Sequence, residues 1–336
     1  MKPTQITDEH TIFTDSYFEA TFIEMSSLLL CKSLLKMKAM SEVVSINTVT
    51  DYNNQVGMET LHPLVSIIDF EKVEPFCNFR MQLGVYAVFL KDSKCGNMTY
   101  GCNTYDYEEG TLLFIAPGQV YGTVNEEKKK YVGKALIFHP DLILGTALGK
   151  NMKDYTFFSY QVNEALHLST RERSIINDCL EKIRYELEHA IDTHSRTLIV
   201  SYIELFFNYC KRFYERQFVT RNHVNKDVLV RFEKLLDEYF SSKKPIEMGP
   251  LSVSYCAEKL FLSANYLGDL LKKETGKSAQ EHIQLKMIDV AKEKIFDQSK
   301  PVGEIAYELG FKYPQHFTRM FKKEVGISPA EFRNQN

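Results

Sequence analysis

Glycine and proline are not abundant in this chain, whose 336 residues include 16 Gly and 10 Pro. Collagen-like and low-complexity chains need a large excess of these residues, so both classes are excluded. Hydrophobic residues make up 44% of the chain and charged residues 25%, which is typical of a globular protein. The length is about twice that of a typical domain and predicts two domains, each with room for a core.

Paired cysteines and long apolar runs are also missing. The seven cysteines are an odd number and form no C-x-x-C motif, so neither a disulfide framework nor a structural zinc site is indicated. A reducing cytoplasm is the expected location. Near the start, the apolar run 28–31 is followed by Lys32 and preceded by acidic residues, which fits neither a signal peptide nor a membrane span. We therefore expect no membrane partner.

The chain has no basic excess, because its formal net charge is -3. From Lys226 to the end there are 18 Lys and Arg against 16 Asp and Glu, whereas the upstream part has 23 against 28. The charge asymmetry is mild and does not identify a nucleic-acid-binding domain by itself. The placement of individual residues has to be considered instead.

An internal repeat occupies the last third of the chain. Residues 253–279 match residues 302–329, with an offset of 49 positions before a turn and 50 after it. In each copy apolar residues return every three or four positions on both sides of the turn, which predicts two short helices. Eight residues of the first copy recur in the second: Val253, Ala257, Leu260, Lys272, Lys273, Glu274, Gly276 and Ser278.

The turn in each copy has the residues that a helix-turn-helix needs. Ala257 and Ala306 are small enough for two helices to cross closely, and Gly310 can adopt the left-handed conformation. In the first copy Phe261 replaces that glycine, and Ser263 is a predicted N-cap. A generic helical bundle is the alternative, but it does not explain why the polar sequence Lys-Lys-Glu is duplicated.

The segment between the copies, 279–296, lacks Pro and Gly and is rich in helix-forming residues. It predicts a connecting helix of about 18 residues, roughly 27 Å long. This length approaches the roughly 34 Å of one DNA turn, so two recognition helices could enter successive major grooves.

Three motifs stand out within residues 250–334: I-A-Y-E-L-G-F at 305–311, the F-x-R-x-F-K-K core at 317–323 and G-I-S-P-A-E-F-R at 326–333. Through these motifs the segment resembles the DNA-binding domain of the AraC/XylS family of bacterial regulators. It implies a cytoplasmic transcription regulator, usually an effector-responsive activator that contacts RNA polymerase, with the upstream segment as sensor or dimeriser. No cofactor is expected.

The second module has the better set of residues for reading DNA. Gln can pair with adenine and Arg with guanine, and the resemblance implies base contacts by Gln315 and Arg319. Lys322 and Lys323 lie a turn later, where phosphate contact is favoured, although they could also be ordinary solvated charges. The predicted contacts of this module are Tyr313, Gln315, His316, Thr318, Arg319, Lys322 and Lys323.

The first module departs from this pattern, because Asp269 stands where the second has Arg319, and Gly268 where it has Thr318. A carboxylate is repelled by phosphates, although it could accept from a cytosine amino group. We therefore expect the second module to contribute more of the affinity. The predicted contacts of the first module are Ser263, Asn265, Tyr266, Lys272 and Lys273.

Upstream, residues 40–165 alternate short apolar runs with turn signals, which predicts a small all-β domain. The stretch 107–121 resembles the cupin-like barrel that precedes the DNA-binding domain in many relatives, and the resemblance implies an effector site whose residues the sequence does not reveal. Catalytic cupins need a cluster of His and Glu. His62 and His139 lie far apart and are more simply structural, so an enzyme is not expected.

Residues 166–220 show two long helical patterns, which predict an antiparallel hairpin. The hairpin could form a homodimer, as it often does in the family, or simply cover the barrel. A linker region is predicted at 221–249. Residues 1–39 match nothing, and the family-like pattern begins just after Met40, which leads to the hypothesis that Met40 is the native start.

The predicted fold class is α+β: a cupin-like β-barrel with a helical hairpin, followed at 250–336 by an all-α domain of two helix-turn-helix modules. The predicted function is sequence-specific binding of double-stranded DNA. One alternative is a cupin-type enzyme with an appended DNA-binding domain, which needs a metal cluster. Another is a helical adaptor for proteins, which needs apolar outer faces on both recognition helices.

Overall fold

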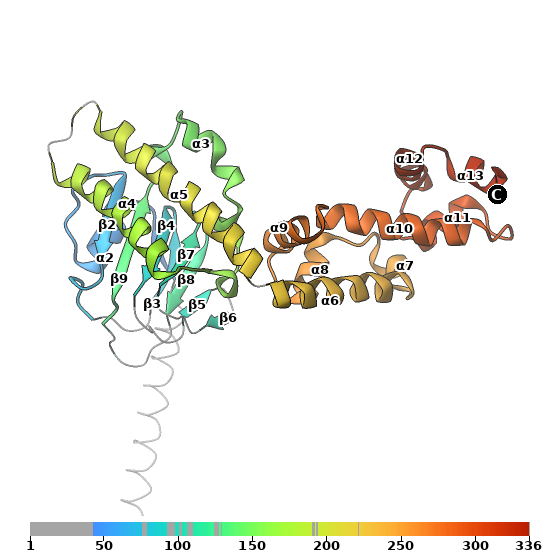
Figure 1. Cartoon of the computed structure of the whole chain (residues 1–336), viewed down its shortest axis with the longest axis horizontal. Coiled ribbons are helices and arrows are strands. Elements are labelled where there is room, and N and C mark those ends of the chain that lie inside the picture. The colour runs from blue at the N-terminus through green and yellow to red at the C-terminus, as the bar shows by residue number, and fades with distance from the viewer. Residues whose placement is uncertain are drawn as a thin grey trace, which may run out of the picture.

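The computed structural model describes residues 43–335, apart from 76–78, 93–97, 101–102, 106–109, 124–127, 129, 190–191, 193 and 221. Residues 1–39 and the hypothesis about Met40 therefore lie outside the described residues. Figure 1 shows an N-terminal part built on β-sheets and a C-terminal part of helices that extends away from it. The chain belongs to the α+β class, as the sequence predicts.

Two five-stranded sheets form the centre of the N-terminal part. The strands are β1 (Val44–Ile46), β2 (Val65–Asp69), β3 (Phe79–Leu83), β4 (Tyr86–Lys91), β5 (Met98–Tyr100), β6 (Asn103–Tyr105), β7 (Thr111–Ile115), β8 (Val120–Thr123), β9 (Gly133–Phe138) and β10 (Leu166–His167). The first sheet has the order β1-β3-β8-β5-β6 and the second β10-β7-β4-β9-β2. Only the pair of β1 with β3 is parallel among the pairs of described strands.

Strand β4 shows why the second sheet is apolar throughout. Ala87 and Phe89 belong to the core cluster between the two sheets, which also contains Met81 of β3. Val88 and Leu90 point to the opposite face and belong to the cluster formed with the helices. Side chains alternate between faces along a strand, so a sheet that is covered on both faces has a nearly continuous apolar sequence.

The described strands form two separate sheets and no closed one. The prediction of a closed, cupin-like barrel is therefore not confirmed. Three of the four edge strands, β1, β6 and β10, are only two or three residues long, which leaves little backbone for pairing across to the other sheet. Between the sheets, Tyr52 of α2 (Val49–Val56) meets Tyr121 with 3.0 Å between the two hydroxyl oxygens.

The predicted helical hairpin consists of α4 (Thr170–Glu188) and α5 (Ser195–Thr220), which lie across the second sheet (Figure 1). Ser169 and Glu172 form a capping box at the start of α4. The Glu172 carboxylate also accepts from Arg216 of α5 at 2.7 Å, which ties the two helices together.

Short helices connect β9 to β10: η1 (Pro140–Leu142), α3 (Ala147–Asn151), η2 (Met152–Asp154), η3 (Thr156–Ser159) and η4 (Val162–Glu164). Helix η3 places two aromatic rings against α5. The ring of Phe157 stacks on Tyr214 at 5.7 Å, and Phe158 meets Phe207 edge-on at 5.4 Å. This aromatic packing fixes the segment that leads toward the C-terminal part.

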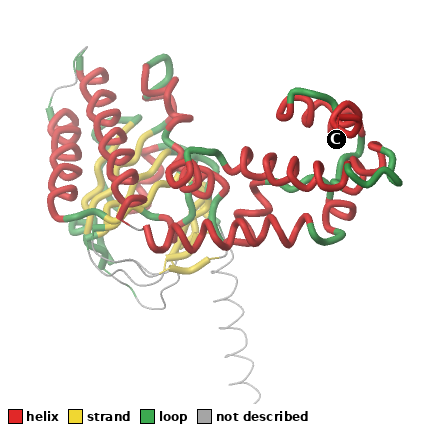
Figure 2. The backbone as a smooth tube through the Cα atoms, turned by 45° about the vertical axis from the view of Figure 1, so that its right-hand side comes forward, coloured by secondary structure: helices red, strands yellow, loops and turns green. Residues whose placement is uncertain are grey.

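The C-terminal part is entirely helical in the described residues. Its helices are α6 (Asn222–Phe240), α7 (Lys244–Met248), α8 (Val253–Leu260), α9 (Ala264–Thr275), α10 (Ala279–Ile295), α11 (Val302–Glu308), α12 (Pro314–Val325) and α13 (Pro329–Gln335). Helix α9 lies toward the sheets, whereas α12 lies in the distant half of the C-terminal part (Figure 1). Figure 2 shows the same helical part extending away from the sheets.

The region predicted as a linker, 221–249, contains the helices α6 and α7. The segment begins with polar residues, but farther on Phe232, Leu236 and Tyr239 form an apolar stripe that is buried where α6 packs against α8, α9 and α10. The amide of the buried Asn225 donates to the Phe218 carbonyl of α5 at 2.6 Å and to the Glu274 carboxylate of α9 at 3.1 Å. Helix α6 is thus an integral part of the C-terminal domain.

Candidate nucleic-acid interface

The first helix-turn-helix module consists of α8 and α9. Leu260 of α8 and Leu267 and Leu270 of α9 are buried in the same core. Phe261 ends α8 in the left-handed conformation, with φ of 60°, although its side chain is 75% exposed. The next helix begins at Ser263, whose hydroxyl accepts from the Tyr266 backbone N–H at 3.1 Å. The predicted N-cap is confirmed.

The second module consists of α11 and α12. Ala306, Phe317 and Phe321 are fully buried. Gly310 has a φ of +90°, and a Cβ atom at this position would lie 2.6 Å from the backbone carbon of Gly249. Only glycine satisfies both the left-handed conformation and this close approach. The predicted role of Gly310 in the turn is therefore confirmed.

Helix α10 joins the two modules. It has 17 residues, one fewer than predicted, and is about 26 Å long. Ion pairs hold the second module to its end, because the Glu308 carboxylate binds Lys294 at 2.5 Å and also Lys300. Hydrogen bonds from these two lysines lower the pKa of Glu308.

The outer face of α12 is polar and exposed. Five of the predicted DNA contacts are exposed on one side of the helix, at a spacing of one and two turns: Gln315, His316, Arg319, Lys322 and Lys323. Thr318 is half-buried, and its hydroxyl donates to the Pro314 carbonyl at 3.2 Å. Tyr313 precedes the helix and is exposed, with its ring 5.6 Å from that of His316.

The corresponding face of α9 has a different environment. Asn265, Lys272 and Lys273 are exposed, but Tyr266 is only 6% exposed. The ring of Tyr266 packs edge-on against Tyr160 of the N-terminal part at 5.2 Å. In this arrangement Tyr266 is not accessible to a DNA duplex, unlike His316 at the equivalent position of α12.

Two carboxylates connect α9 to the N-terminal part. Glu164 of η4 accepts from both the backbone N–H and the hydroxyl of Ser263, each at 2.6 Å. Asp269 accepts from the hydroxyls of Tyr160 at 2.6 Å and Thr156 at 2.7 Å. The side chain that was predicted to lie near phosphates is therefore bound to the protein itself.

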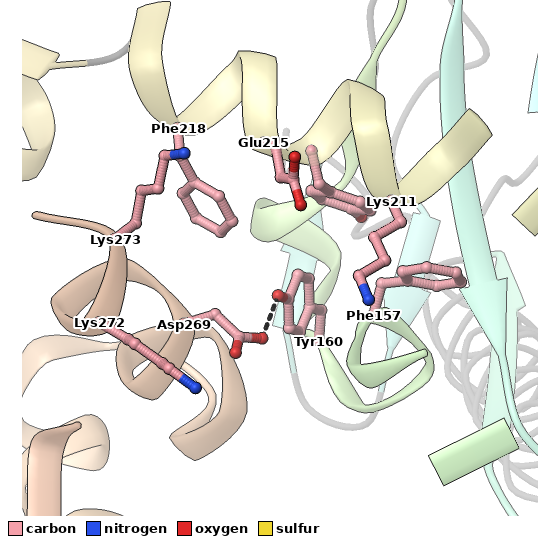
Figure 3. Close-up of a pocket in the computed structure, with 9 residues that line it drawn as sticks. Phe157, Tyr160, Lys211, Glu215, Phe218, Asp269, Lys272 and Lys273 are labelled. Atoms are coloured by element: carbon pink, nitrogen blue, oxygen red, sulfur yellow. Dashed lines mark hydrogen bonds between the residues drawn. The ribbon is translucent and has the colours of Figure 1, made fainter. Parts of the chain in front are cut away.

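Glu164 and Tyr160, which make these contacts from the N-terminal part, are both buried. Burial raises the pKa of Glu164, while the Ser263 hydrogen bonds act in the opposite direction. Burial, followed by the nearby Asp269 carboxylate, raises the pKa of Tyr160. A cavity of about 250 Å³ lies beside them (Figure 3). Its walls include Lys211, Glu215 and Phe218 of α5 and Asp269, Lys272 and Lys273 of α9.

The sequence did not identify Thr156, Tyr160 and Glu164 as partners of the first module. They lie 99 to 113 positions from the residues of α9 that they bind. No periodic pattern connects such distant positions. One sequence feature indicated a different role for α9: the first module has the acidic Asp269 where the second module has Arg319.

The described residues contain no group of three or more His, Cys, Asp or Glu side chains that could hold a metal ion. Nδ1 of His62 accepts the backbone N–H of Leu64 at 3.0 Å, and Nδ1 of His139 that of Asp141 at 3.2 Å. Both histidines thus stabilise local turns, as predicted for structural residues. Among the described helices, none combines the length and the hydropathy that crossing a bilayer requires.

Comparison with known proteins identifies the helical repeat. A family model described as a helix-turn-helix domain matches residues 256–335. The transcriptional regulatory protein YesN of Bacillus subtilis is 35% identical over 88 residues, which cover 25% of this chain and 24% of YesN. The chain thus spans about a quarter of that relative.

A longer match extends into the N-terminal part. The HTH-type transcriptional regulator YfiF of B. subtilis is 29% identical over 236 residues, covering 70% of this chain and 72% of YfiF. Among solved structures, the C-terminal domain of the response regulator yesN from Fusobacterium nucleatum is 27% identical and covers 30% of this chain and 93% of that chain, with a TM-score of 0.27.

These observations define the C-terminal part as a double helix-turn-helix domain of the DNA-binding class. The two modules, the helix that connects them and the similar regulators all indicate the same type of DNA-binding domain. Residues 256–335 are an AraC-type helix-turn-helix domain. Over 70% of its length the chain is similar to an HTH-type transcriptional regulator.

Proposed function

We propose that this chain is a sequence-specific DNA-binding transcription regulator of the AraC/XylS type, in which α12 is the main reading helix. The observation that carries this proposal is the face of α12, where polar and basic side chains are exposed above a core of Phe317 and Phe321. Exposed residues near the start of a recognition helix face base edges in the major groove.

The residues of α12 divide into two roles. Gln315 and Arg319 are exposed and carry groups that can pair with adenine and guanine edges, whereas Lys322 and Lys323, a turn later, suit phosphate contact. Tyr313, His316 and Thr318 flank these positions and complete the proposed contact set. In the first module Asn265, Lys272 and Lys273 are exposed and remain proposed contacts, while Ser263 and Tyr266 are engaged by the N-terminal part.

The remaining proposals rest on the family. We propose activation of transcription through contact with RNA polymerase in the cytoplasm, and a sensor role for the N-terminal part. A cupin-like relationship of the two sheets and a small-molecule effector bound there belong to the same proposal. The N-terminal core between the sheets is filled by apolar side chains. The alternatives are weaker: the described residues hold no metal cluster for a cupin-type enzyme, and α12 is too polar for a protein adaptor.

A homodimer formed by α4 and α5 is also proposed. Leu198 and Leu205 are exposed and two turns apart on α5, and Tyr185 of α4 is exposed as well. Exposed apolar side chains that gather on one face are typical of interaction sites.

Selection of genomic fragments by the full chain, followed by fluorescence anisotropy with the selected duplex, tests the DNA-binding function. Affinity should decrease steeply with salt, because phosphate contacts release counterions. An Arg319→Ala variant should lose preference for the selected sequence over a scrambled duplex. Absence of binding to any duplex at low salt would refute the proposal.

A further inference from the structure

The start of α9 is covered by the N-terminal part, although in a reading helix this end has to face DNA. Residues near the start of a recognition helix contact base edges, and its free N–H groups attract phosphate. Here the Glu164 carboxylate accepts from the Ser263 backbone N–H and hydroxyl. A negative charge of the chain itself therefore occupies the place where a DNA phosphate would bind.

A second contact holds the same face of α9 one turn and a half later. Asp269 accepts from the Tyr160 hydroxyl (Figure 3) and from the Thr156 hydroxyl. The Tyr160 ring also packs edge-on against Tyr266. Asn163, next to Glu164, donates its side-chain amide to the Phe261 carbonyl in the turn of the module, at 3.3 Å. Contacts from η3 and η4 thus extend over the turn and the first half of α9.

The second module provides an internal comparison. At the equivalent of Asp269 it has Arg319, which is exposed, and at the equivalent of Tyr266 it has His316, also exposed. Its N-cap residue, Tyr313, makes no side-chain capping hydrogen bond. The same fold occurs twice in this chain, so a residue that differs between the two modules is not required by the fold. Tyr266 and Asp269 differ in this way, and both contact the N-terminal part.

From these contacts we infer that Glu164, Thr156 and Tyr160 form an autoinhibitory latch that holds the first recognition helix on the N-terminal part and keeps it from DNA. The inference rests on the proposed DNA-binding function and deepens it by naming a regulation of that site. In the latched chain only α12 is free to read DNA. Opening of the latch allows both modules to enter successive major grooves.

The interface combines hydrogen bonds with aromatic packing. Tyr266 contacts the rings of Tyr160 and Phe218, and all three belong to one buried apolar cluster, beside a cavity of about 250 Å³. The carboxylates gain most of their stabilisation from hydroxyl and N–H donors, which water can replace.

The test removes donors and acceptors from the N-terminal side only, so that α9 and its DNA contacts stay unchanged. Tyr160→Phe removes one hydroxyl bond to Asp269 and retains the ring, and Glu164→Ala removes the carboxylate at Ser263. Tyr155→Phe is the matched control, because it removes a hydroxyl that donates to Asn208 of α5, 3.2 Å away, and not to α9. All variants are made in the full chain.

The double variant Tyr160→Phe/Glu164→Ala should bind the selected duplex about five- to thirty-fold more tightly than the wild type, since a one to two kcal/mol contact changes an equilibrium by this factor. Its hydroxyl-radical footprint should extend by roughly one helical turn, as the second major groove becomes occupied. Hydrogen exchange should accelerate in α9 but not in α12. The control variant should behave like the wild type.

A gain of affinity cannot result from misfolding, so the expected result is informative even if the double variant is less stable. If the double variant binds DNA with the affinity and the footprint of the wild type, the latch is wrong, whereas the proposed DNA-binding function stands. A lack of binding by the wild type and by every variant would overturn the proposed function, and with it the regulatory role of the latch.

Discussion

At the scale of single residues, the two modules use different residues for the left-handed position of the same turn. Gly310 adopts its left-handed conformation with the backbone of Gly249 directly against it, whereas Phe261 adopts nearly the same conformation as a bulky residue in open surroundings. A left-handed conformation costs a non-glycine residue of the order of 1–2 kcal/mol. The first module therefore contains local strain that the second does not.

Gly310→Ala should lower the free energy of unfolding of the C-terminal domain by about 2–4 kcal/mol, because the methyl group would add a backbone clash to the cost of a positive φ. Gly326→Ala is the matched control. Gly326 has the same φ of +90° but no atom near its added Cβ, so this variant should cost only about 1 kcal/mol. Calorimetry of both variants measures the difference, and equal losses would mean that the approach of Gly249 is unimportant.

Arg319 and Lys322 should respond differently to truncation. Arg319→Ala should cost about 1–3 kcal/mol of binding free energy and relax preference at one base pair, because the guanidinium can pair bidentately with guanine. Lys322→Ala should weaken all sequences similarly and reduce the salt slope by about one unit, as a phosphate contact does. Titrations against one selected duplex and its single-base substitutions separate the two roles. Uniform weakening by Arg319→Ala would contradict base reading.

At the scale of elements, the junction of α10 and α11 depends on one carboxylate. Glu308 binds Lys294 and Lys300, and its pKa is lowered below the usual 4.5 by these hydrogen bonds. Because the pKa in the folded state is lower than in the unfolded chain, the stabilisation is complete above the unfolded value and is lost as the pH falls through the folded value.

Glu308→Gln should therefore lower the free energy of unfolding by about 0.5–1 kcal/mol at neutral pH, a modest effect because both lysines are partly exposed. The variant and the wild type should converge as the pH falls below the carboxyl range. Urea unfolding at neutral and acid pH measures this convergence. Glu258→Gln, an exposed residue of α8, is the control, and a Glu308→Gln deficit that persists in acid would show that packing and not charge is responsible.

At the scale of the whole molecule, the exposed face of α5 determines the proposed dimer. Phe206 lies in the same apolar pattern as Leu198, but Phe206 is fully buried inside the chain. It packs edge-on against Phe207 at 5.8 Å. A charge at Phe206 would disturb the fold itself, so the exposed Leu198 and Leu205 are the residues to test.

Leu198→Glu combined with Leu205→Glu should convert a dimer into a monomer, because two charges would enter an apolar contact. Sedimentation of the full chain measures the change, and unaltered circular dichroism would show that the fold is intact. Leu144→Glu, at an exposed leucine in the turn before α3, is the control and should leave the assembly unchanged. A wild type that sediments as a monomer with and without DNA would contradict the proposed dimer.

The sequence predicted the elements whose signals are local. The repeat predicted α8, α9, α11 and α12, since the helical period and the turn at Gly310 depend on residues that are close together in the sequence. The hairpin of α4 and α5 followed from the same period. Helix α6 was not predicted, because its first residues are polar and typical of a linker. Its apolar stripe is explained only by the neighbouring helices α8, α9 and α10, on which it packs.

By itself, the sequence determined the α+β class, the two modules and the residues that α12 exposes, because each depends on periodicity within a few turns of chain. Only the tertiary structure decided that two separate sheets form, that Tyr266 is buried and that Glu164 and Asp269 connect α9 to the N-terminal part. These contacts join residues about one hundred positions apart. Whether such residues meet depends on how complete domains pack, and no local pattern of the chain records that packing.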